Sequence, residues 1–155
     1  MGNKITIYTD GAASGNPGPG GYGAILKSGE HYKEISQGYR LTTNNRMELL
    51  AAIVALETLK YEGSEVVIYT DSKYVCDAVE KGWVFGWEKT RFKNKKNPDL
   101  WKRFLNVYRK HQVKFLWVKG HNNNPGNERC DELAVKASQQ RKLLKDEGYE
   151  LNREM

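Results

Sequence analysis

The sequence predicts an α/β fold in which a mixed five-stranded sheet, three antiparallel strands followed by parallel ones, carries helices on both faces. Short runs rich in Val, Ile, Thr and Tyr, as at Lys4–Thr9 and Glu65–Thr70, predict strands. The opening strands have short links that suit antiparallel pairing, whereas later strands are reached through helices and suit parallel addition. The stretch Met47–Leu56 is apolar except for Glu48, which predicts a helix covered on several sides.

The amino-terminal part is expected to form a strand, a tight connection and a hairpin. The first strand covers about Lys4–Tyr8. The segment Gly11–Gly23 contains six Gly and two Pro, which favours a sharp connection rather than a linker. Strands at about Tyr22–Ser28 and Glu30–Leu41 then pair as an antiparallel hairpin around Ser28-Gly29.

The remainder of the chain alternates helices and strands. A helix opens at Thr42-Thr43-Asn44-Asn45 and runs to about Lys60. The polar tail from about residue 145 is expected to be frayed. Five elements are expected between the end of this helix and the start of the tail: a strand at Glu65–Thr70, helices at about Ser72–Glu80 and Asp99–Arg109, a strand at Val113–Val118 and a helix from about Asn127 to Leu144.

Length and composition indicate one globular domain spanning residues 1–155. Hydrophobic residues make up 39% and charged residues 28% of the chain, and no apolar run approaches the ~18 residues of a membrane span. The first residues lack the pattern of a signal peptide. The two cysteines, Cys76 and Cys130, are therefore expected to be buried, reduced thiols. We expect a monomeric, cytoplasmic protein that does not contact membranes.

The positive charge is concentrated in one segment. Between Lys89 and Lys119 there are eleven Lys and Arg and one acid, Asp99, so this segment carries +10 in a chain of +6 and the rest carries −4. A basic segment on a body of opposite charge is typical of a protein that binds a polyanion. The alternative is a solubilising surface, but such surfaces usually mix both signs.

Two aspartates follow matching strands. Tyr-Thr-Asp closes the run that ends at Asp10 and recurs in the run that ends at Asp71. If the two strands are neighbours, their carboxylates meet at one edge of the sheet, where ligands of α/β proteins bind. Each aspartate alone is better explained as a turn or cap residue. The repetition of the whole tripeptide favours a functional pair instead.

Two further acids begin helices. Glu48 is the one charge in the apolar stretch, and Asp131 lies in the first turns of the last helix. Each alone is better explained by helix capping or by the helix dipole, and Asn45 and Glu48 have capping-box spacing. Four converging carboxylates would repel one another strongly without cations. Oxygen ligands without a His or Cys cluster indicate Mg²⁺ or Mn²⁺.

Six motifs, in this order, give the chain a strong resemblance to the type-one bacterial ribonuclease H family. They are Thr9-Asp10-Gly11, the segment from Gly15 to Gly23, Thr43-Asn44-Asn45-Arg46-Met47-Glu48, Thr70-Asp71-Ser72, Val118-Lys119-Gly120-His121 and the segment from Asn127 to Ala134. The resemblance covers about residues 4–144 and implies the ribonuclease H-like fold.

The resemblance also implies an activity and its residues. Asp10, Glu48, Asp71 and Asp131 match the family's acidic metal ligands, which hold two Mg²⁺ ions when substrate is bound, with Mn²⁺ able to substitute. His121 matches a loop histidine that assists proton movement and product departure. The implied reaction is hydrolysis of the RNA strand of an RNA·DNA hybrid, leaving 5′-phosphate and 3′-hydroxyl ends.

Substrate contacts are expected in two regions. One is a cluster near the acids that reads the 2′-hydroxyl and holds the strand backbones, consisting of Gly11, Asn16, Thr43, Asn44, Asn45 and Arg46. The other resembles the family's basic handle, at about 82–101, and contributes Trp83, Lys89, Arg91, Lys93, Lys95 and Lys96. The handle looks several residues shorter than in relatives, and Lys73 stands where an uncharged amide is expected.

Two other interpretations remain open from the sequence. The same fold serves enzymes that cut or join DNA strands, so fold alone does not decide the substrate. A non-catalytic hybrid-binding module is the other alternative. Four mutually repelling carboxylates near a phosphate argue against a simple binder, and the handle tryptophans are as well explained by packing as by stacking on bases.

Overall fold

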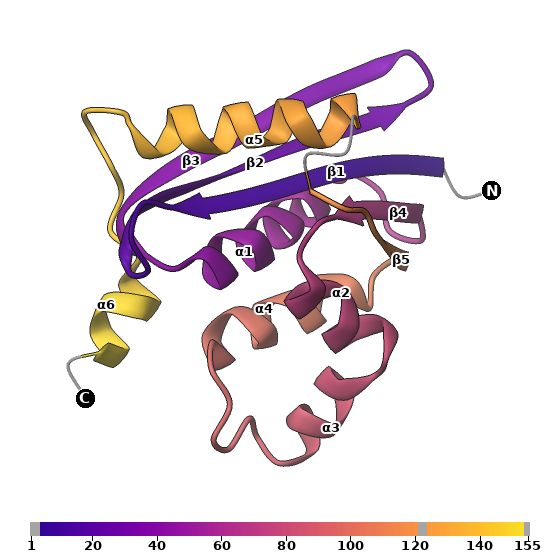
Figure 1. Cartoon of the computed structure of the whole chain (residues 1–155). Helices are drawn as coiled ribbons and strands as arrows, with labels where there is room; N and C mark the ends of the chain where they lie inside the picture. Colours follow the sequence, from indigo (N-terminus) through magenta and orange to yellow (C-terminus); the bar gives the residue numbers. More distant parts are fainter. Residues whose placement is uncertain (1–3, 121–123, 154–155) are drawn as a thin grey trace.

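The computed structural model describes residues 4–120 and 124–153 and contains one five-stranded sheet. The sheet order is β3-β2-β1-β4-β5, with β1 to β3 antiparallel and β4 and β5 added in parallel, which confirms the predicted fold class (Figure 1). The strands are β1 (Lys4–Ala13), β2 (Gly18–Ser28), β3 (His31–Thr42), β4 (Glu65–Thr70) and β5 (Gln112–Trp117).

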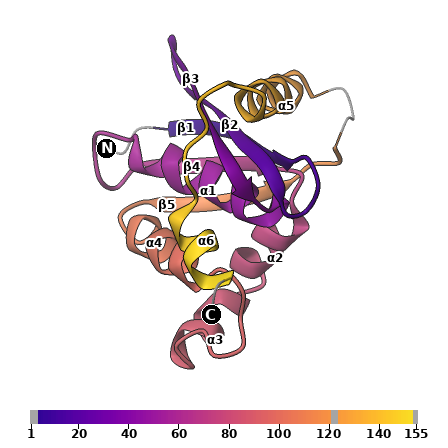
Figure 2. The ribbon, with the colours of Figure 1, turned by 90° about the vertical axis from the view of Figure 1, so that its left-hand side faces the viewer.

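Helices cover both faces of the sheet. α5 packs along β1, β2 and β3 on one face, and α1 packs on β1 and β2 from the other, backed by α4 and α2 (Figure 2). Among the described residues no helix is long and apolar enough to cross a membrane. The helices are α1 (Asn44–Glu57), α2 (Lys73–Glu80), α3 (Trp83–Lys89), α4 (Pro98–Tyr108), α5 (Pro125–Ser138) and α6 (Glu147–Arg153).

The predicted glycine-rich connection is largely strand. β1 continues to Ala13 and β2 begins at Gly18, so that Ala13 pairs with Gly20 in an antiparallel ladder. Glycines occur in this segment because of helix packing rather than turn formation. A Cβ on Gly23 would lie 2.5 Å from the carbonyl oxygen of Cys130 in α5. Glycine in β2 therefore allows α5 to approach the sheet closely.

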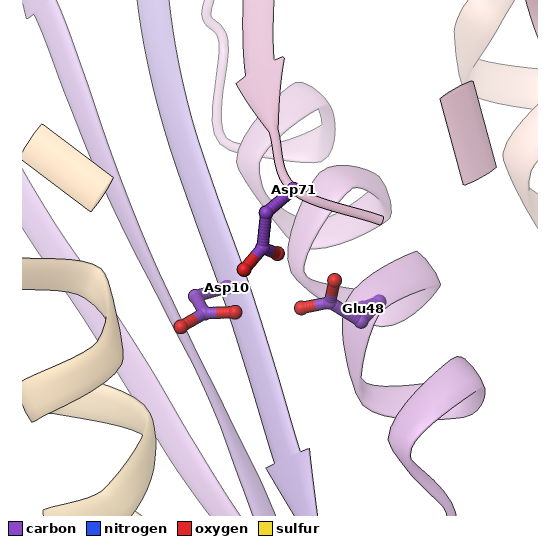
Figure 3. A group of neighbouring side chains, drawn as sticks. All are labelled: Asp10, Glu48 and Asp71. Carbon is purple, nitrogen blue, oxygen red and sulfur yellow. The ribbon is translucent and has the colours of Figure 1, made fainter. Parts of the chain in front are cut away.

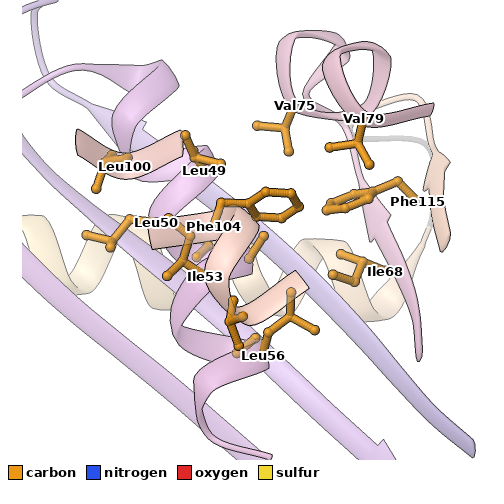
Figure 4. Packing of buried hydrophobic residues seen from close by; sticks show 14 of the residues in the cluster. Leu49, Leu50, Ile53, Leu56, Ile68, Val75, Val79, Leu100, Phe104 and Phe115 are labelled. Atoms are coloured by element: carbon orange, nitrogen blue, oxygen red, sulfur yellow. The ribbon is translucent and has the colours of Figure 1, made fainter. Parts of the chain in front are cut away.

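The core lies between the sheet and the layer formed by α1, α2 and α4. α1 is buried nearly all round, as its composition predicts, and contributes Leu49, Ile53 and Leu56 (Figure 4). Phe104 of α4 packs against Phe115 of β5 with ring centroids 5.9 Å apart. Burial of such side chains supplies most of the favourable free energy of folding.

The basic handle is a helix followed by a tight loop. α3 was not predicted, and Phe92 in the loop after it is buried. Trp87 packs edge-on against the fully buried Trp101 at 5.8 Å, which favours the packing interpretation of these two tryptophans. The predicted cations are all exposed, Lys89 at the end of α3 and Arg91, Lys93, Lys95 and Lys96 in the loop.

The expectation of a frayed tail is wrong. α5 ends at Ser138 rather than near Leu144, and the chain then returns to β3, where the Leu144 amide donates to the carbonyl oxygen of Gly38 over 3.0 Å. α6 follows, and Asp146 just before it is 6% exposed. The Thr42 hydroxyl at the end of β3 donates to Asp146 over 2.7 Å.

Asp146 accepts from Arg46, whose side chain has a different role from the one predicted. Arg46 is 2% exposed, and its guanidinium donates to Asp146 and Asp99 over 2.8 to 2.9 Å and to the side-chain oxygen of Asn97 over 3.3 Å. All five N–H groups of the guanidinium are occupied in this way. Arg46 therefore has no free donor for the strand-backbone contact that the motif suggested, and it joins the carboxyl-terminal segment to the start of α4.

We expect Asp146→Asn to lower the free energy of unfolding by about 3 kcal/mol, because loss of one partner leaves the buried Arg46 guanidinium undercompensated. Urea unfolding followed by circular dichroism measures the change. Glu57→Gln is the matched control, since Glu57 pairs with Arg103 on the surface, and it should cost no more than about 1 kcal/mol. Equal losses in the two variants would contradict the assigned role of Asp146.

Candidate active site

Three of the four predicted acids meet at one point. Asp10, Glu48 and Asp71 each offer a carboxylate oxygen, and these oxygens lie within 4.8 Å of one another. Figure 3 shows the side chains pointing toward one another from β1, from α1 and from the segment after β4. Asp10 and Glu48 are 9% and 8% exposed. The three carboxylates are called the acidic cluster below.

The parallel pairing of β1 and β4 brings the two aspartates together. Their register sets Tyr8 beside Tyr69, and the two rings stack at 5.2 Å. Asp10 and Asp71 each follow two residues later, so they are neighbours where this pairing stops. The predicted position is corrected in one respect, because Asp10 lies within β1, which continues along β2.

Glu48 reaches the cluster through a close contact between α1 and β1. The Gly11 amide donates to the Glu48 carboxylate and also to Asp10, the latter over 2.9 Å. A Cβ on Gly11 would lie 2.4 Å from the backbone nitrogen of Glu48, so only glycine fits there. The capping-box explanation of Glu48 is wrong, since Thr43 is the N-cap and Glu48 turns toward Gly11 instead.

Asp131 lies near the acidic cluster without belonging to it. It is partly exposed on α5 and, with Asp10 and Asp71, lines a small hollow, but it is not one of the three residues of the acidic cluster. Lys119 and Asn127 line the same hollow. The fourth predicted ligand is therefore adjacent to the cluster and outside it in this structure.

Asn127 is a site residue that the sequence interpretation did not single out. Its side-chain amide donates over 3.4 Å to the carbonyl oxygens of Thr9 and Tyr69, and so bridges β1 and β4 just before their aspartates. Its side-chain oxygen is buried and has no hydrogen-bond partner among the described residues. The Asn124 side chain caps α5 by accepting a hydrogen bond from the backbone N–H of Asn127 over 3.2 Å. The signal available in the sequence was its place four residues before Asp131, at the start of the motif Asn127–Ala134.

Proton affinity in the cluster is high. The pKa of Asp10 is raised to about 7, chiefly by burial and also by the charges of Asp71 and Asp131, while its hydrogen bonds with Glu48 and the Gly11 amide act in the opposite direction. Burial also raises the pKa of Glu48 well above its usual value, and the charges of Asp10 and Asp71 act in the same direction. Buried carboxylates at this spacing need a proton or a cation between them.

The donor set fits a hard divalent cation. It consists of carboxylate oxygens from three separate elements, and among residues 4–120 and 124–153 no other group of His, Cys, Asp or Glu meets the same spacing. Oxygen ligands of this kind suit Mg²⁺ or Mn²⁺ better than softer ions. Asp10, Glu48 and Asp71 could hold such an ion.

Two of the three predicted asparagines, Asn44 and Asn45, line the same hollow as the acidic cluster, and Asn16 contacts Asn44. The Ala13 amide donates to the Asn44 side-chain oxygen over 2.6 Å, and the Asn44 amide donates to the side-chain oxygen of Asn16 over 3.1 Å. These bonds tie the β1–β2 turn to the start of α1. Asn45 is exposed and lines a hollow together with Asp10, Glu48 and Lys73.

A second hollow joins the asparagines to the basic handle. Its lining includes Asn16, Thr43, Asn45, Lys95 and Lys96, so two of the predicted cations face the same space as the predicted strand readers. Trp83 is 48% exposed, with the Lys81 ammonium 5.3 Å from its ring centre. His121 lies outside the described residues.

Comparisons with known proteins identify the family of the chain. The model of the family described as RNase H matches residues 2–139. The chain belongs to the ribonuclease H family. Ribonuclease H of Trichodesmium erythraeum (strain IMS101) is 59% identical over 152 residues, which cover 95% of this chain and 96% of the relative. Ribonuclease HI of Synechocystis sp. (strain ATCC 27184 / PCC 6803 / Kazusa) is 52% identical and covers 95% of both chains.

Solved structures of the family share the fold. LC9-RNase H1, a type 1 RNase H with the type 2 active-site motif, superposes with a TM-score of 0.81 at 29% identity and covers all of this chain and 82% of its own. LC11-RNase H1, solved in complex with RNA/DNA hybrid, gives a TM-score of 0.66 at 28% identity and covers 86% of this chain and 95% of its own.

The raised pKa of Asp10 predicts a pH dependence of stability in the metal-free protein. The folded state binds this proton more tightly than the unfolded chain, so the stabilisation is complete below about pH 4 and is lost as the pH rises through about 7. We expect Asp10→Asn to remove the part of the dependence that Asp10 contributes. The unfolding free energy of the variant minus that of wild type should then be about 2 kcal/mol larger at pH 8 than at pH 5.

Urea midpoints in a chelating buffer measure this difference. Glu34, whose pKa its partner Arg129 lowers to about 2, titrates outside this range and acts equally in both proteins. Glu48 has a pKa raised in the same direction, and it accounts for any pH dependence that Asp10→Asn retains. Parallel stability curves for wild type and Asp10→Asn between pH 5 and pH 8 would show that Asp10 ionises normally.

Proposed function

We propose that the chain is an endoribonuclease that hydrolyses the RNA strand of RNA·DNA hybrids by a two-metal-ion mechanism and leaves 5′-phosphate and 3′-hydroxyl ends. The observation that carries the proposal is the acidic cluster, in which three carboxylates from β1, α1 and the end of β4 converge within 4.8 Å. Family membership and the hybrid bound to LC11-RNase H1 support the choice of substrate.

The acids are proposed to hold Mg²⁺, with Mn²⁺ able to substitute. Asp10, Glu48 and Asp71 would be ligands on one side, and Asp131 would complete the set from α5. Two divalent ions in such a site can activate a water and stabilise the leaving oxygen. The Gly11 amide keeps Glu48 in place for this role. His121 is proposed to assist proton movement, as an imidazole titrates near neutral pH.

Discrimination of RNA from DNA is assigned to the asparagine cluster. Asn44 and Asn45 line the hollow of the acids and Asn16 contacts Asn44, and side-chain amides can both donate to and accept from a 2′-hydroxyl. Thr43 is proposed to contact a strand backbone from the hollow that it shares with Asn16 and Lys96. The Gly11 backbone lies beside the reacting strand in this arrangement.

The basic handle is proposed to hold phosphates of the hybrid away from the reacting bond. Lys89, Arg91, Lys93, Lys95 and Lys96 are all exposed, and ionic contacts of this kind need no particular sequence. Trp83 offers an exposed ring beside them. Lys73 is proposed as a further cation at the rim of the acidic cluster.

We also propose that the protein acts as a monomer in the cytoplasm. Both cysteines are buried and unpaired as thiols, as expected, which suits a reducing compartment. Sedimentation at working concentrations tests the oligomeric state.

A gel assay with labelled duplexes tests the function as a whole. An RNA·DNA hybrid should be cut in its RNA strand in the presence of Mg²⁺, and a chelator should stop the reaction. An all-DNA duplex of the same sequence should remain intact. Cleavage of the DNA duplex would favour a DNA-strand nuclease, and hybrid binding without cleavage would favour a binding module.

We expect Asp71→Asn to lower turnover by about a hundredfold or more, because one charged ligand of the cluster is lost. Hybrid binding should persist, since repulsion of the phosphates falls. Asp77→Asn is the matched control. Asp77 is an acid of α2 that pairs with Lys81 over 3.6 Å, and its replacement should leave turnover near wild type. Undiminished cleavage by Asp71→Asn would exclude the proposed metal site.

Replacement of Lys93, Lys95 and Lys96 by Gln should raise KM and flatten its salt dependence, with kcat nearly unchanged. Each lost phosphate contact should reduce the log–log salt slope by roughly 0.9 on a B-form duplex. Cleavage kinetics from low to moderate salt measure both effects. The control replaces the exposed Lys33, Lys60 and Lys142, which removes the same charge elsewhere. The same slope in all three proteins would mean that the handle does not hold phosphates.

A further inference from the structure

Trp117 lies beside the acidic cluster and has no role in the function described so far. It is the last residue of β5 and pairs with Thr70, the last residue of β4. Its indole N–H donates over 3.0 Å to the carbonyl oxygen of Asp71. The side chain is 43% exposed, so burial of its ring in the core does not explain its position.

The carbonyl of Asp71 lies between two regular elements. The Val118 amide donates to the Thr70 carbonyl over 2.8 Å, which ends the β4–β5 ladder, and the first bond of α2 runs from the Cys76 amide to the Ser72 carbonyl. The indole of Trp117 supplies the donor that neither element provides. This bond also fixes the plane of the ring relative to the cluster.

The ammonium of Lys73 lies over the Trp117 ring. The Lys73 ammonium lies 4.7 Å from the centre of the Trp117 ring, within the usual range of a cation–π contact. Lys73 lines the same hollow as Asp10, Glu48 and Asp71. Within the described part of the chain, no ion pair joins Lys73 to these acids.

The position of Lys73 away from the acids requires an explanation, because Lys73 is only two positions from Asp71 and has a long, flexible side chain. Three nearby carboxylates would attract its ammonium, and an ammonium among them would occupy the space that a divalent cation needs. For an exposed lysine, attraction to an indole ring is of the same order as an ion pair. The ring can therefore determine where the ammonium rests.

We propose that Trp117 is a positioning residue that retains Lys73 on its ring and thereby keeps the acidic cluster open for a divalent cation. The inference rests on the proposed function of that cluster. The hydrogen bond to Asp71 orients the ring, and the ring holds the ammonium at the rim. A cation can in this way stand close to the metal ligands without neutralising them.

An NMR titration of the free protein with MgCl₂, followed through backbone amides around Gly11, tests the proposal without reference to activity. Trp117→Leu should weaken Mg²⁺ binding by about fivefold, because the released ammonium competes with the metal. Adding Lys73→Gln to Trp117→Leu should restore the affinity to within about twofold of Lys73→Gln alone. Adding Lys81→Gln instead removes a lysine that stacks on Trp83, and it should restore nothing.

Lys73→Gln alone provides a test that does not depend on the folding of Trp117→Leu. With Trp117 intact it should change Mg²⁺ affinity by less than about twofold, because the ammonium already lies away from the carboxylates. A rise of fivefold would overturn the proposal, as would a loss in Trp117→Leu that Lys73→Gln does not relieve. Absence of Mg²⁺ binding in the wild type would instead refute the metal site itself.

Discussion

The contact between Gly11 and the first turn of α1 is the constraint on which the site depends. α1 is buried on nearly every side, so the core fixes its position, and its approach to β1 is possible only because Gly11 has no side chain. This approach places Glu48 against Asp10 regardless of their mutual repulsion. The raised pKa values of both groups are the electrostatic consequence of a geometry that hydrophobic packing imposes. A bound proton or cation then relieves an unfavourable arrangement that already exists.

Elements with a strong local pattern could be predicted from the sequence. The bounds of β4 match the prediction, and the convergence of Asp10 and Asp71 follows from parallel pairing of two similar strands. The glycine-rich segment was misjudged because glycine signals a turn locally, whereas here it permits a helix to approach the sheet. α3 was missed because its sequence combines aromatic residues with Gly86, which gives little helical preference.

The role of Arg46 could not be predicted, because its partners are distant in the sequence. Asp99 is 53 positions away and Asp146 is 100 positions away. The same group of residues continues through Asn97, whose side chain donates to the Tyr74 hydroxyl over 3.1 Å. It therefore joins the end of the handle loop, the carboxyl-terminal segment and α2 to the helix that carries Glu48. The surfaces proposed to bind phosphates and the carboxylates proposed to bind metal share this support.

The two buried thiols allow the two faces of the sheet to be observed separately. Cys76 lies in α2 on the face covered by α1, and Cys130 lies in α5 on the opposite face, where its thiol donates to the Tyr8 carbonyl over 3.2 Å. Burial raises the pKa of both thiols, so neither is reactive while its helix remains in place. An alkylating reagent therefore reports the opening of each layer through a different cysteine. Mass spectrometry of the two labelled peptides distinguishes local opening from global unfolding without any introduced cysteine.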